Sequence, residues 1–577
     1  MQSRLLSLKD LLFILPISLT LGAALSAIQP GAWWIGWLGF SALFIVGLLA
    51  LVAAWRWACA ERRSEPVEDQ GVAVSLSNGR SIGAGKTLAW MIGLALLLRL
   101  AAGVAVYIAL PINGHNTPDD KAGYVFTDAH RRDDQSWQLA SSGKPLWTAF
   151  DRSYYTDQYG GLLAFSAFTY RYLSPDAQRP LLIILLASLA AALGVPFLYK
   201  ATRLLWDEKL AVVASWLFVL YPESILTGGA QMREPFLLTF IAMSLWGFAA
   251  WLKHGQPNAR AEREAEPVEA RSVALPKVPK GRSGAWLWMA VGFIGMLLVN
   301  PAVALVTLLI FVVWVYVRGE HKRLPWQALV ALAVIFILAL FVLSWGLNRN
   351  NDFGTQSPLG VILDWFRAAA KWDTYRLERG SGWIQSLFRK MNTSEQLLFA
   401  IIYGLLQPVL PAAFTDPSTL TWRIIGISRA LGWYLLLPLM IYSFIAAWRT
   451  PAGAERRLWL WIVSASWLWV LVCSIRGGGD QWDNPRYRLW LLAFQALASA
   501  YAWIWWRAHR DAWLPRIIAV EVLAVLIFLQ WYASRYYHFG GQIPFFLMIG
   551  LIVLVALVII AGGWLWDRRF KVRLTRP

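Results

Sequence analysis

The residues best suited to chemistry lie in three short polar segments, each beside a long apolar stretch. The first, Thr127 to Ala140, contains Asp128, Asp133 and Asp134 among arginines. A carboxylate beside fixed positive charges can act as a general base, because neighbouring charges and burial set its pKa. A segment of this composition is also typical of a solvated loop. The sequence therefore leaves all three aspartates as candidates for one catalytic base.

The second and third segments each begin an apolar stretch. Arg233 and Glu234 open one, where a carboxylate favoured by the helix dipole can cap the helix and still take part in catalysis. Arg486, Tyr487 and Arg488 precede another. Planar guanidinium groups suit phosphate oxygens, and they also suit anchoring at a membrane surface. Phosphate recognition and interfacial anchoring both remain open.

A metal site is not predicted from these residues. Asp134 and His130 could contribute oxygen and nitrogen ligands to a divalent cation such as Mg or Mn, but their spacing is not diagnostic. We therefore assign no metal ligands and no certain cofactor.

The composition indicates a membrane protein. Of 577 residues, 58% are hydrophobic and only 15% are charged, and the mean hydropathy is +0.48. Soluble domains usually contain about 25% charged residues. The net charge of +19 resides largely in short loops after alternate apolar stretches, as expected for the cytoplasmic side of a membrane. This distribution argues against nucleic acid as a partner.

Apolar stretches long enough to cross a bilayer predict an all-α polytopic membrane protein with about fourteen transmembrane helices. The basic loops place both termini in the cytoplasm, and the polar segments at the outer face of the cell membrane. The predicted helices lie near 11–29, 33–55, 87–110, 180–199, 210–226, 234–253, 285–299, 301–317, 325–346, 424–448, 458–475, 488–507, 516–533 and 543–565.

The chain divides into three predicted regions. Residues 1–86 form a transmembrane hairpin with a cytoplasmic loop, residues 87–507 form the region with the candidate catalytic residues, and residues 508–577 form a second hairpin with a basic tail. Within residues 87–507 we expect two long outer loops with short interfacial helices and a disordered cytoplasmic linker. These are 111–179 and 347–423 for the loops and 254–284 for the linker.

Together, the order of these motifs resembles the integral-membrane glycosyltransferases of the GT-C class, including protein mannosyltransferases (glycosyltransferase family 39) and the aminoarabinose transferases of lipid A. Members have an acidic motif in the first large outer loop, followed by an aromatic, a small residue and a glycine. Here Asp133-Asp134 precedes Trp137, Ala140 and Gly143, with Asp128 as a rival.

The resemblance extends over roughly residues 87–507. It includes Arg99 in the third helix, Tyr221-Pro222 followed by Arg233-Glu234, and Arg486-Tyr487-Arg488-Leu489 before a late helix. Trp490 stands where the class pattern has a proline, and the doubled acidic motif leaves the key carboxylate ambiguous.

The resemblance implies an inverting hexosyl- or pentosyltransferase. Its donor would be a sugar on a polyprenyl-phosphate carrier, and its acceptor a lipid, a glycan or a protein at the outer face. Asp128 or Asp133 would remove the proton of the acceptor hydroxyl, with Asp134 as a third candidate. Arg486 and Arg488 would stabilise the leaving phosphate, with Tyr487 beside them. Arg233 and Glu234 would position the sugar or the acceptor.

Two other functions remain. A transporter or lipid-linked sugar flippase would have ionisable residues along a path at membrane depth, and the candidates are Arg99, Arg429 and Glu521. An oligosaccharide ligase or polymerase would rely on arginine-rich outer loops. The carboxylates of residues 128–134 favour the glycosyltransferase.

Overall fold

The computed structural model describes residues 6–60, 74–154, 156–254, 280–319, 326–351, 357–365, 367–368 and 382–574. All regular elements in these residues are helices. The elements of the first part of the chain are α1 (Leu8–Ala27), α2 (Trp33–Ala60), α3 (Val74–Asn113), α4 (Pro118–Lys121), α5 (Thr127–Ser141), η2 (Leu146–Phe150), η3 (Arg152–Tyr154), α6 (Gly161–Leu173), α7 (Pro180–Leu205), α8 (Glu208–Leu220), α9 (Pro222–Gly228), α10 (Glu234–His254), α11 (Lys280–Val299), α12 (Pro301–Val317) and α13 (Trp326–Asn351). Those of the second part are α15 (Gly382–Phe388), α16 (Thr393–Leu406), α17 (Leu410–Thr415), α18 (Leu420–Arg449), α19 (Ala454–Gly477), α20 (Asp483–Arg488), η5 (Leu489–Leu491), α21 (Leu492–His509), α22 (Trp513–Tyr536) and α23 (Phe545–Leu574).

Ten of the described helices are long and apolar enough to cross a membrane, or up to eleven if the bent pair α8–α9 is one span. Each of the fourteen predicted segments overlaps a helix, but α12 and the apolar parts described for α11 and α13 are shorter apolar helices of 10–17 residues. The all-helical membrane architecture is therefore confirmed, and the count of fourteen spans is not. The predicted orientation stays a prediction.

The chain forms two compact units. The first unit comprises Met1–Ile112, Asn116–Arg367 and Leu489–Ala493, and the second comprises Asn113–His115, Ala368–Arg488 and Phe494–Pro577. The three predicted sequence regions stay a prediction. Most of the predicted linker, residues 255–279, lies outside the described residues.

In the first unit, α7 is buried along most of its length and packs against α2, α8 and α10. Helix α10 also packs closely on α11, where a Cβ atom at Gly292 would lie 2.2 Å from Ser244 Oγ. The small elements α5, η2, η3 and α6 pack together over a core that contains Leu139, Leu163 and Tyr170. This core fixes which face of α5 points inward.

The bend between α8 and α9 matters for the site. The two helices meet at an angle of 57°, with Tyr221 extended between them and Pro222 opening α9. Proline at the first turn of a helix needs no N–H partner, and it disfavours the helical conformation of the residue before it. The sequence Tyr221-Pro222 thus ends one helix and starts the next.

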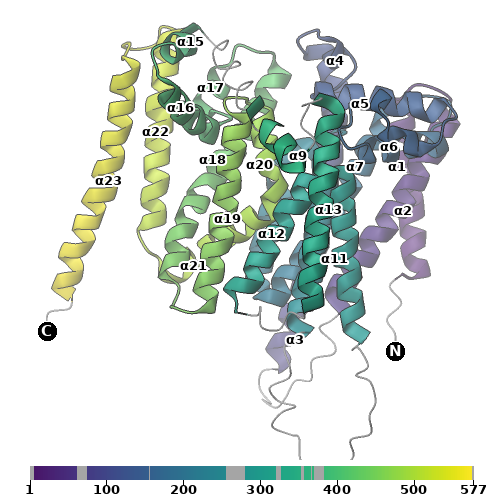
Figure 1. The fold of residues 1–577 in the computed structure, drawn as a ribbon, viewed down its shortest axis with the longest axis horizontal. Helices are drawn as coiled ribbons and strands as arrows, with labels where there is room; N and C mark the ends of the chain where they lie inside the picture. Colours follow the sequence, from purple (N-terminus) through teal and green to yellow (C-terminus); the bar gives the residue numbers. More distant parts are fainter. Residues whose placement is uncertain are drawn as a thin grey trace, which may run out of the picture. The chain divides into compact units, whose positions relative to one another are not determined.

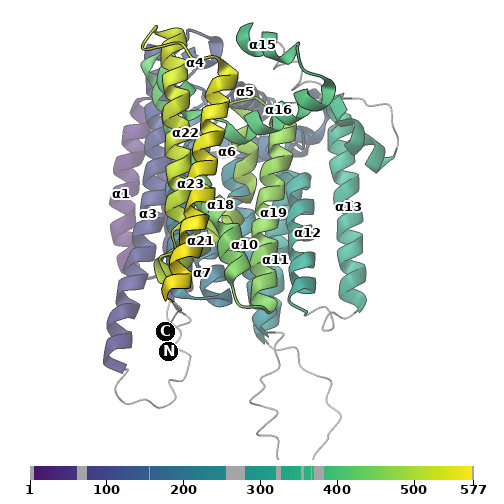
Figure 2. The same ribbon diagram turned by 90° about the vertical axis from the view of Figure 1, so that its left-hand side faces the viewer.

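In the second unit, α18 packs on α19 and α22, and α16 packs on α19. Helices α22 and α23 lie side by side (Figures 1 and 2) and are joined by Arg516, whose guanidinium donates to both oxygens of Asp567 at 2.7 and 2.9 Å. Helix α16 overlaps the second predicted outer loop, and its location at a membrane interface stays a prediction.

Candidate functional site

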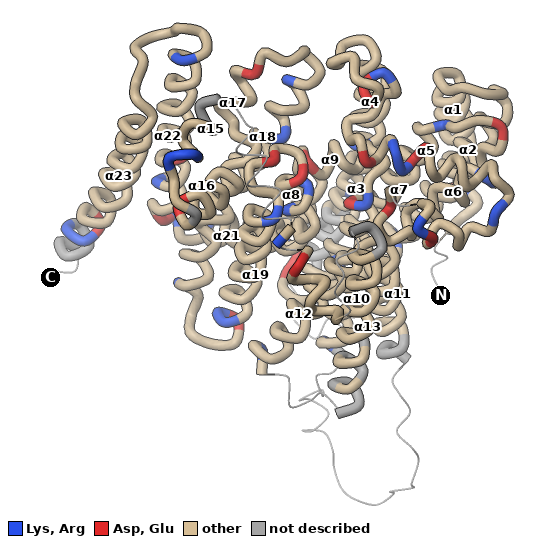
Figure 3. The backbone as a smooth tube through the Cα atoms, turned by 45° about the horizontal axis from the view of Figure 1, so that its top comes forward, with Lys and Arg blue, Asp and Glu red and all other residues tan. Residues whose placement is uncertain are grey.

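Helix α5 carries all three candidate aspartates, one on its buried face and two with exposed side chains. Its buried residues are Ala129, Arg132, Asp133, Ser136, Leu139 and Ala140, which recur with the spacing of a helical face. Acidic and basic residues follow one another along α5 and the neighbouring α4 (Figure 3). Asp133 therefore lies on the packed side of the helix, whereas Asp128 and Asp134 retain exposed surface of 38% and 47%.

Asp133 is the centre of a buried hydrogen-bond network. Its side chain is 1% exposed and accepts hydrogen bonds from Tyr124 Oη and Tyr170 Oη, each at 2.6 Å. Gln178 Nε2 donates to it at 2.8 Å, and the Gln231 side chain also contributes. A carboxylate surrounded by donors in this way links α5, α6 and the loops on either side of them.

The electrostatics of this network follow from burial. Burial raises the pKa of Asp133, although its four hydrogen-bond donors oppose that shift. Burial and the negative charge of Asp133 raise the pKa of Tyr124 and of Tyr170 well above the ordinary value, so both phenols remain proton donors. Asp133 thus has the environment of a structural carboxyl group.

Asp128 has a different environment. It lies in the first turn of α5, where the helix dipole favours its ionised form. One turn later Arg132, whose side chain is only 3% exposed, brings Nη2 to 3.6 Å from Asp128 Oδ2. An ionised, partly exposed carboxylate held beside a fixed cation can accept a proton from a bound hydroxyl group.

Besides Asp128, the Arg132 guanidinium contacts the backbone carbonyl of Gln231 and a second carboxylate, that of Asp157. Its Nη1 donates to the carbonyl oxygen of Gln231 at 3.0 Å, and its Nε lies 3.9 Å from Oδ1 of the buried Asp157. Asp157 Oδ2 accepts from the backbone N–H of Leu163 at 2.9 Å. Burial lowers the pKa of Arg132, and Asp128 and Asp157 act in the opposite sense.

Glu234 begins α10, as the sequence predicted, and is 2% exposed. Its Oε1 accepts a hydrogen bond from Trp490 Nε1 at 3.3 Å, so Trp490, the departure from the class pattern, has a defined role. Arg233 is half-buried, with its guanidinium 5.8 Å from the centre of the Tyr159 ring. Arg233 and Glu234 are both close enough to Arg132 to influence its pKa.

His130 and Asp134 do not form a metal site with other ligands in the described part of the chain, where no group of three or more His, Cys, Asp or Glu suits a metal ion. His130 Nδ1 instead lies 2.7 Å from Asp119 Oδ1, and Nε2 lies 3.6 Å from Asp134 Oδ2. Partial burial raises the pKa of Asp119, but hydrogen bonds from Thr127 and His130 outweigh burial, and the pKa is lower than the ordinary value. The pair Asp119 and His130 tethers α4 to α5.

The arginines lie in α20 of the second unit. Arg488 is 1% exposed, donates to the carbonyl oxygens of Leu405 and Gln407 at the end of α16, and lies 4.0 Å from the centre of the Trp433 ring. A cation at this position satisfies carbonyl groups that a helix end leaves without partners. Arg488 therefore has a structural environment.

Arg486 and Tyr487 complete this segment. Arg486 Nη2 pairs with Asp483 Oδ1 at 2.9 Å, one turn earlier, and Asp483 is 36% exposed. The Arg486 guanidinium lies 5.3 Å from the Tyr487 ring centre, while the Tyr487 carbonyl accepts from Trp469 Nε1 at 3.0 Å. Arg486 is thus the member of the segment that reaches toward an exposed side chain.

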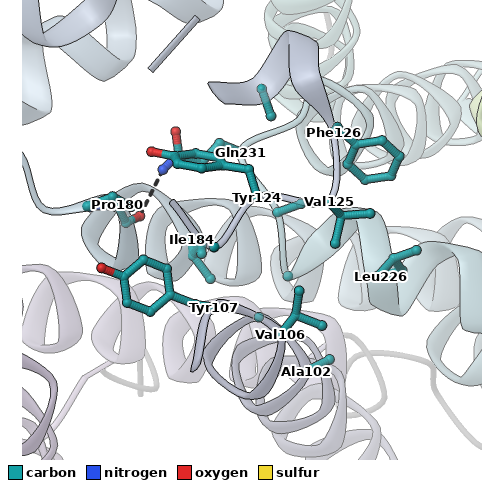
Figure 4. Close-up of a pocket in the computed structure, with 15 residues that line it drawn as sticks. Ala102, Val106, Tyr107, Tyr124, Val125, Phe126, Pro180, Ile184, Leu226 and Gln231 are labelled. Carbon is teal, nitrogen blue, oxygen red and sulfur yellow. Dashed lines mark hydrogen bonds between the residues drawn. The ribbon is translucent and has the colours of Figure 1, made fainter. Parts of the chain in front are cut away.

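A small pocket of the first unit lies beside the Asp133 network. Residues of α3, α7, the start of α5 and the α9–α10 loop line it, and most of them are apolar. Figure 4 shows Gln231 above the pocket, where its Nε2 donates to the Pro180 carbonyl at 3.1 Å. Tyr124, which binds Asp133, and Phe126, two residues before Asp128, also line the pocket.

Within the first unit, Asp128, Arg233 and Glu234 all lie near Arg132, whereas Asp133 bonds to Tyr124, Tyr170 and Gln178. Asp134 shares Gln178 with Asp133 at 3.1 Å. Sequence reasoning did not single out Arg132 and Asp157. Arg132 follows Asp128 by four residues, the spacing of helical ion pairs, and this signal could have identified it. Asp157 had no such signal, because it comes from a different loop.

No protein-family model matches the chain, and no curated protein matches it by sequence. Solved structures similar to it include the oligosaccharyltransferase AglB from Archaeoglobus fulgidus in complex with an inhibitory peptide and a dolichol-phosphate, at 15% identity and a TM-score of 0.35. The match covers 82% of this chain and 55% of that one, so the chain spans little more than half the length of the archaeal protein.

An Archaeoglobus fulgidus oligosaccharyltransferase in the apo form matches at 15% identity and a TM-score of 0.37, over 82% of this chain and 55% of that chain. ArnT from Cupriavidus metallidurans bound to undecaprenyl phosphate matches at 15% identity and a TM-score of 0.28, over 71% of this chain and 77% of that one. None of these TM-scores is high enough to decide the fold or the activity. These structures, an oligosaccharyltransferase and ArnT, are glycosyltransferases of the GT-C class.

Proposed function

We propose that this protein is a membrane glycosyltransferase that moves a sugar from a polyprenyl-phosphate carrier to an acceptor hydroxyl at the outer face of the cytoplasmic membrane. The observation that carries the proposal is the pair Asp128 and Arg132, an exposed carboxylate 3.6 Å from a buried guanidinium. A general base of this kind is what an acceptor hydroxyl requires.

In the proposed reaction the acceptor oxygen attacks the anomeric carbon from the side opposite the phosphate. The new glycosidic bond forms as the bond between that carbon and the phosphate oxygen breaks, so the configuration inverts. Asp128 takes the hydroxyl proton, and the carrier leaves as polyprenyl phosphate. Arg132 and Asp157 keep Asp128 in place, while Arg233 and Glu234 position the sugar or the acceptor.

The leaving phosphate needs a cation, and Arg486 is the better candidate of the two arginines of α20. Arg488 uses its donors on the carbonyl groups of α16, whereas Arg486 pairs with the exposed Asp483. A phosphate group could replace that carboxylate as the partner of a planar guanidinium. Tyr487 lies beside Arg486 and would line the same site.

The test is transfer by the purified protein in proteoliposomes that contain a radiolabelled polyprenyl-phosphate sugar and an acceptor-containing membrane extract. We expect label in a product with a new, acid-labile glycosidic bond of inverted configuration. Movement of intact labelled lipid between leaflets without such a bond would support the flippase and refute this proposal. The structure gives the transporter little support, since Arg99, one of its three path residues, directs its donors to helix ends.

A further inference from the structure

Arg99 is a fully buried charge in the middle of a membrane-spanning helix, and the reaction proposed above does not use it. It lies in α3 and is 0% exposed. A charged side chain at such a position is costly, so its partners are informative. Nη1 donates to the carbonyl oxygens of Ala95 at 3.1 Å and Val219 at 3.3 Å. Nη2 donates to the Phe218 carbonyl at 3.3 Å and to Ser224 Oγ at 2.7 Å.

Three of these four partners lie at the bend between α8 and α9. Phe218 and Val219 are in the last turn of α8, and Ser224 is in the first turn of α9. The last carbonyl groups of a helix have no partner within the helix, and inside a bilayer no water replaces one. The Arg99 guanidinium supplies hydrogen-bond donors to the carbonyl groups at the end of α8 and to Ser224 in α9. It is therefore bonded to the helices on both sides of the 57° bend.

Glycines bring the far end of α9 against the same helix. A Cβ atom at Gly228 would lie 2.6 Å from Arg99 Cδ, and one at Gly229 would lie 2.5 Å from the Arg99 carbonyl oxygen. A Cβ atom at Gly103 would lie 2.4 Å from the Gly229 carbonyl oxygen. Since real contacts are never this short, only glycine allows α3 and the end of α9 to approach so closely.

The segment that follows α9 leads directly to the proposed base. The Gln231 carbonyl accepts from Arg132 Nη1, its side chain bonds with Asp133, and Glu234 begins α10. Arg132 in turn faces Asp128. The position of the Gln231 carbonyl therefore sets the position of Arg132, and the bend held by Arg99 sets where the Gln231 segment runs.

We infer that Arg99 is a positioning residue: by holding the α8–α9 bend against α3 it fixes the segment 229–234, and through it Arg132 and the base Asp128. The role in catalysis rests on the function proposed above. The hold on the segment 229–234 does not, and it can be measured without any turnover.

The experiment compares Arg99→Lys with wild type by hydrogen–deuterium exchange in detergent micelles, followed peptide by peptide. Lysine keeps the charge but cannot reach four acceptors, so we expect exchange in peptides from residues 225–236 to become about tenfold faster, while α1, α2 and α22 stay unchanged. The kcat for transfer should fall about tenfold or more with an unchanged KM for the lipid donor, because misplaced catalytic groups affect the chemical step.

The matched control is Arg171→Lys. Arg171 also directs its guanidinium to backbone carbonyls at a helix end, those of Leu139, Ala140 and Lys144. We expect it to leave exchange in residues 225–236 as in wild type. If Arg99→Lys does not insert stably, Ser224→Ala removes a single partner of Arg99 and should accelerate exchange in the same peptides by a smaller factor.

Unchanged exchange in residues 225–236, in Arg99→Lys or in Ser224→Ala when that variant is used, would overturn the inference whatever the activity. Exchange that rises equally in the Arg171→Lys control would also overturn it, because the effect would then be general loosening. If exchange rises locally but the wild-type protein transfers no sugar, the proposed function fails and the hold of Arg99 on the segment stands.

Discussion

The carboxylates of α5 and the arginines of α20 carry opposite charges, yet the two sets divide in a similar way. In each, one side chain is buried among several partners: Asp133 among two tyrosines and two glutamines, and Arg488 among two carbonyl groups and a tryptophan ring. In each, another forms an ion pair with one partly exposed member, which is Asp128 itself in α5 and the partner Asp483 in α20. Asp128 faces Arg132, and Arg486 faces Asp483.

The comparison shows that a charged residue in an apolar protein is not functional simply because it is rare. A buried charge must be paired and hydrogen-bonded, and once all its bonds are made it has little left for a substrate. A side chain whose ion pair has a partly exposed member can exchange solvent or that partner for substrate. This distinction leads us to favour Asp128 and Arg486 over Asp133 and Arg488.

The largest effect is expected for Asp128→Asn. The amide cannot accept the acceptor proton, so kcat for sugar transfer should fall by roughly 10²- to 10⁴-fold. Transfer from the radiolabelled donor in proteoliposomes measures it. Asp151→Asn, which changes an exposed aspartate in the same region, should retain wild-type transfer. Full activity of Asp128→Asn together with loss in Asp133→Asn would reverse the assignment on α5.

Arg488→Met should lower stability rather than donor affinity. It leaves the Leu405 and Gln407 carbonyl groups without this donor inside the second unit, at a cost of about 2–4 kcal/mol in the free energy of unfolding. The fall in Tm of the purified protein measures it. Arg449→Met removes a more exposed pair with Asp511 and should cost about 0–1 kcal/mol. A normal Tm with lost donor binding would make Arg488 the phosphate ligand.

Arg486→Gln tests the other half of the arginine segment. Loss of a charge-assisted contact to phosphate should raise the KM for the polyprenyl-phosphate donor by about 10- to 100-fold. The fall in Tm should be smaller than in Arg488→Met, because Asp483 is partly exposed and can be solvated. Donor titration in the transfer assay gives the KM. Equal KM values for Arg486→Gln and wild type would exclude Arg486 from phosphate binding.

The smallest effect is a pH dependence that distinguishes Asp133 from Asp128. Because burial raises the pKa of Asp133 in the folded protein, its protonated form is favoured there over the ionised form. Its favourable contribution is complete below the ordinary value of 3.8 and is lost as the pH rises through the raised folded pKa.

Asp133→Asn has no such titration. The Tm of wild type minus that of Asp133→Asn should therefore decrease as the pH rises above 3.8, since the other carboxyl groups titrate in both proteins. Thermal unfolding of the two proteins across a pH series gives this difference. A difference that increases with pH would mean that the four donors, rather than burial, dominate at Asp133.

Much of the helical fold could be predicted from the sequence, because a bilayer forces long apolar stretches into helices. The start of α10 at Glu234 follows from local rules of helix ends. The predicted helix near 210–226 is divided in the structure by the bend at Tyr221-Pro222, where the proline ends one helix and opens the next. The number of spans could not be predicted so well. Helices α11 and α12 are apolar but short, and the hydropathy of a segment does not say where its helix ends.

The sequence by itself determined that this is an all-helical membrane protein and that its scarce carboxylates gather near residues 128–134 and 234, since composition and local spacing are enough for both. Only the tertiary structure showed that the aspartates of α5 have different surroundings, on which we base the choice of Asp128. The choice depends on Tyr170, Gln178, Asp157 and the Gln231 carbonyl, which come from other segments of the chain. Burial and the set of hydrogen-bond donors are properties of the packed chain, and they separate a structural carboxyl group from a base.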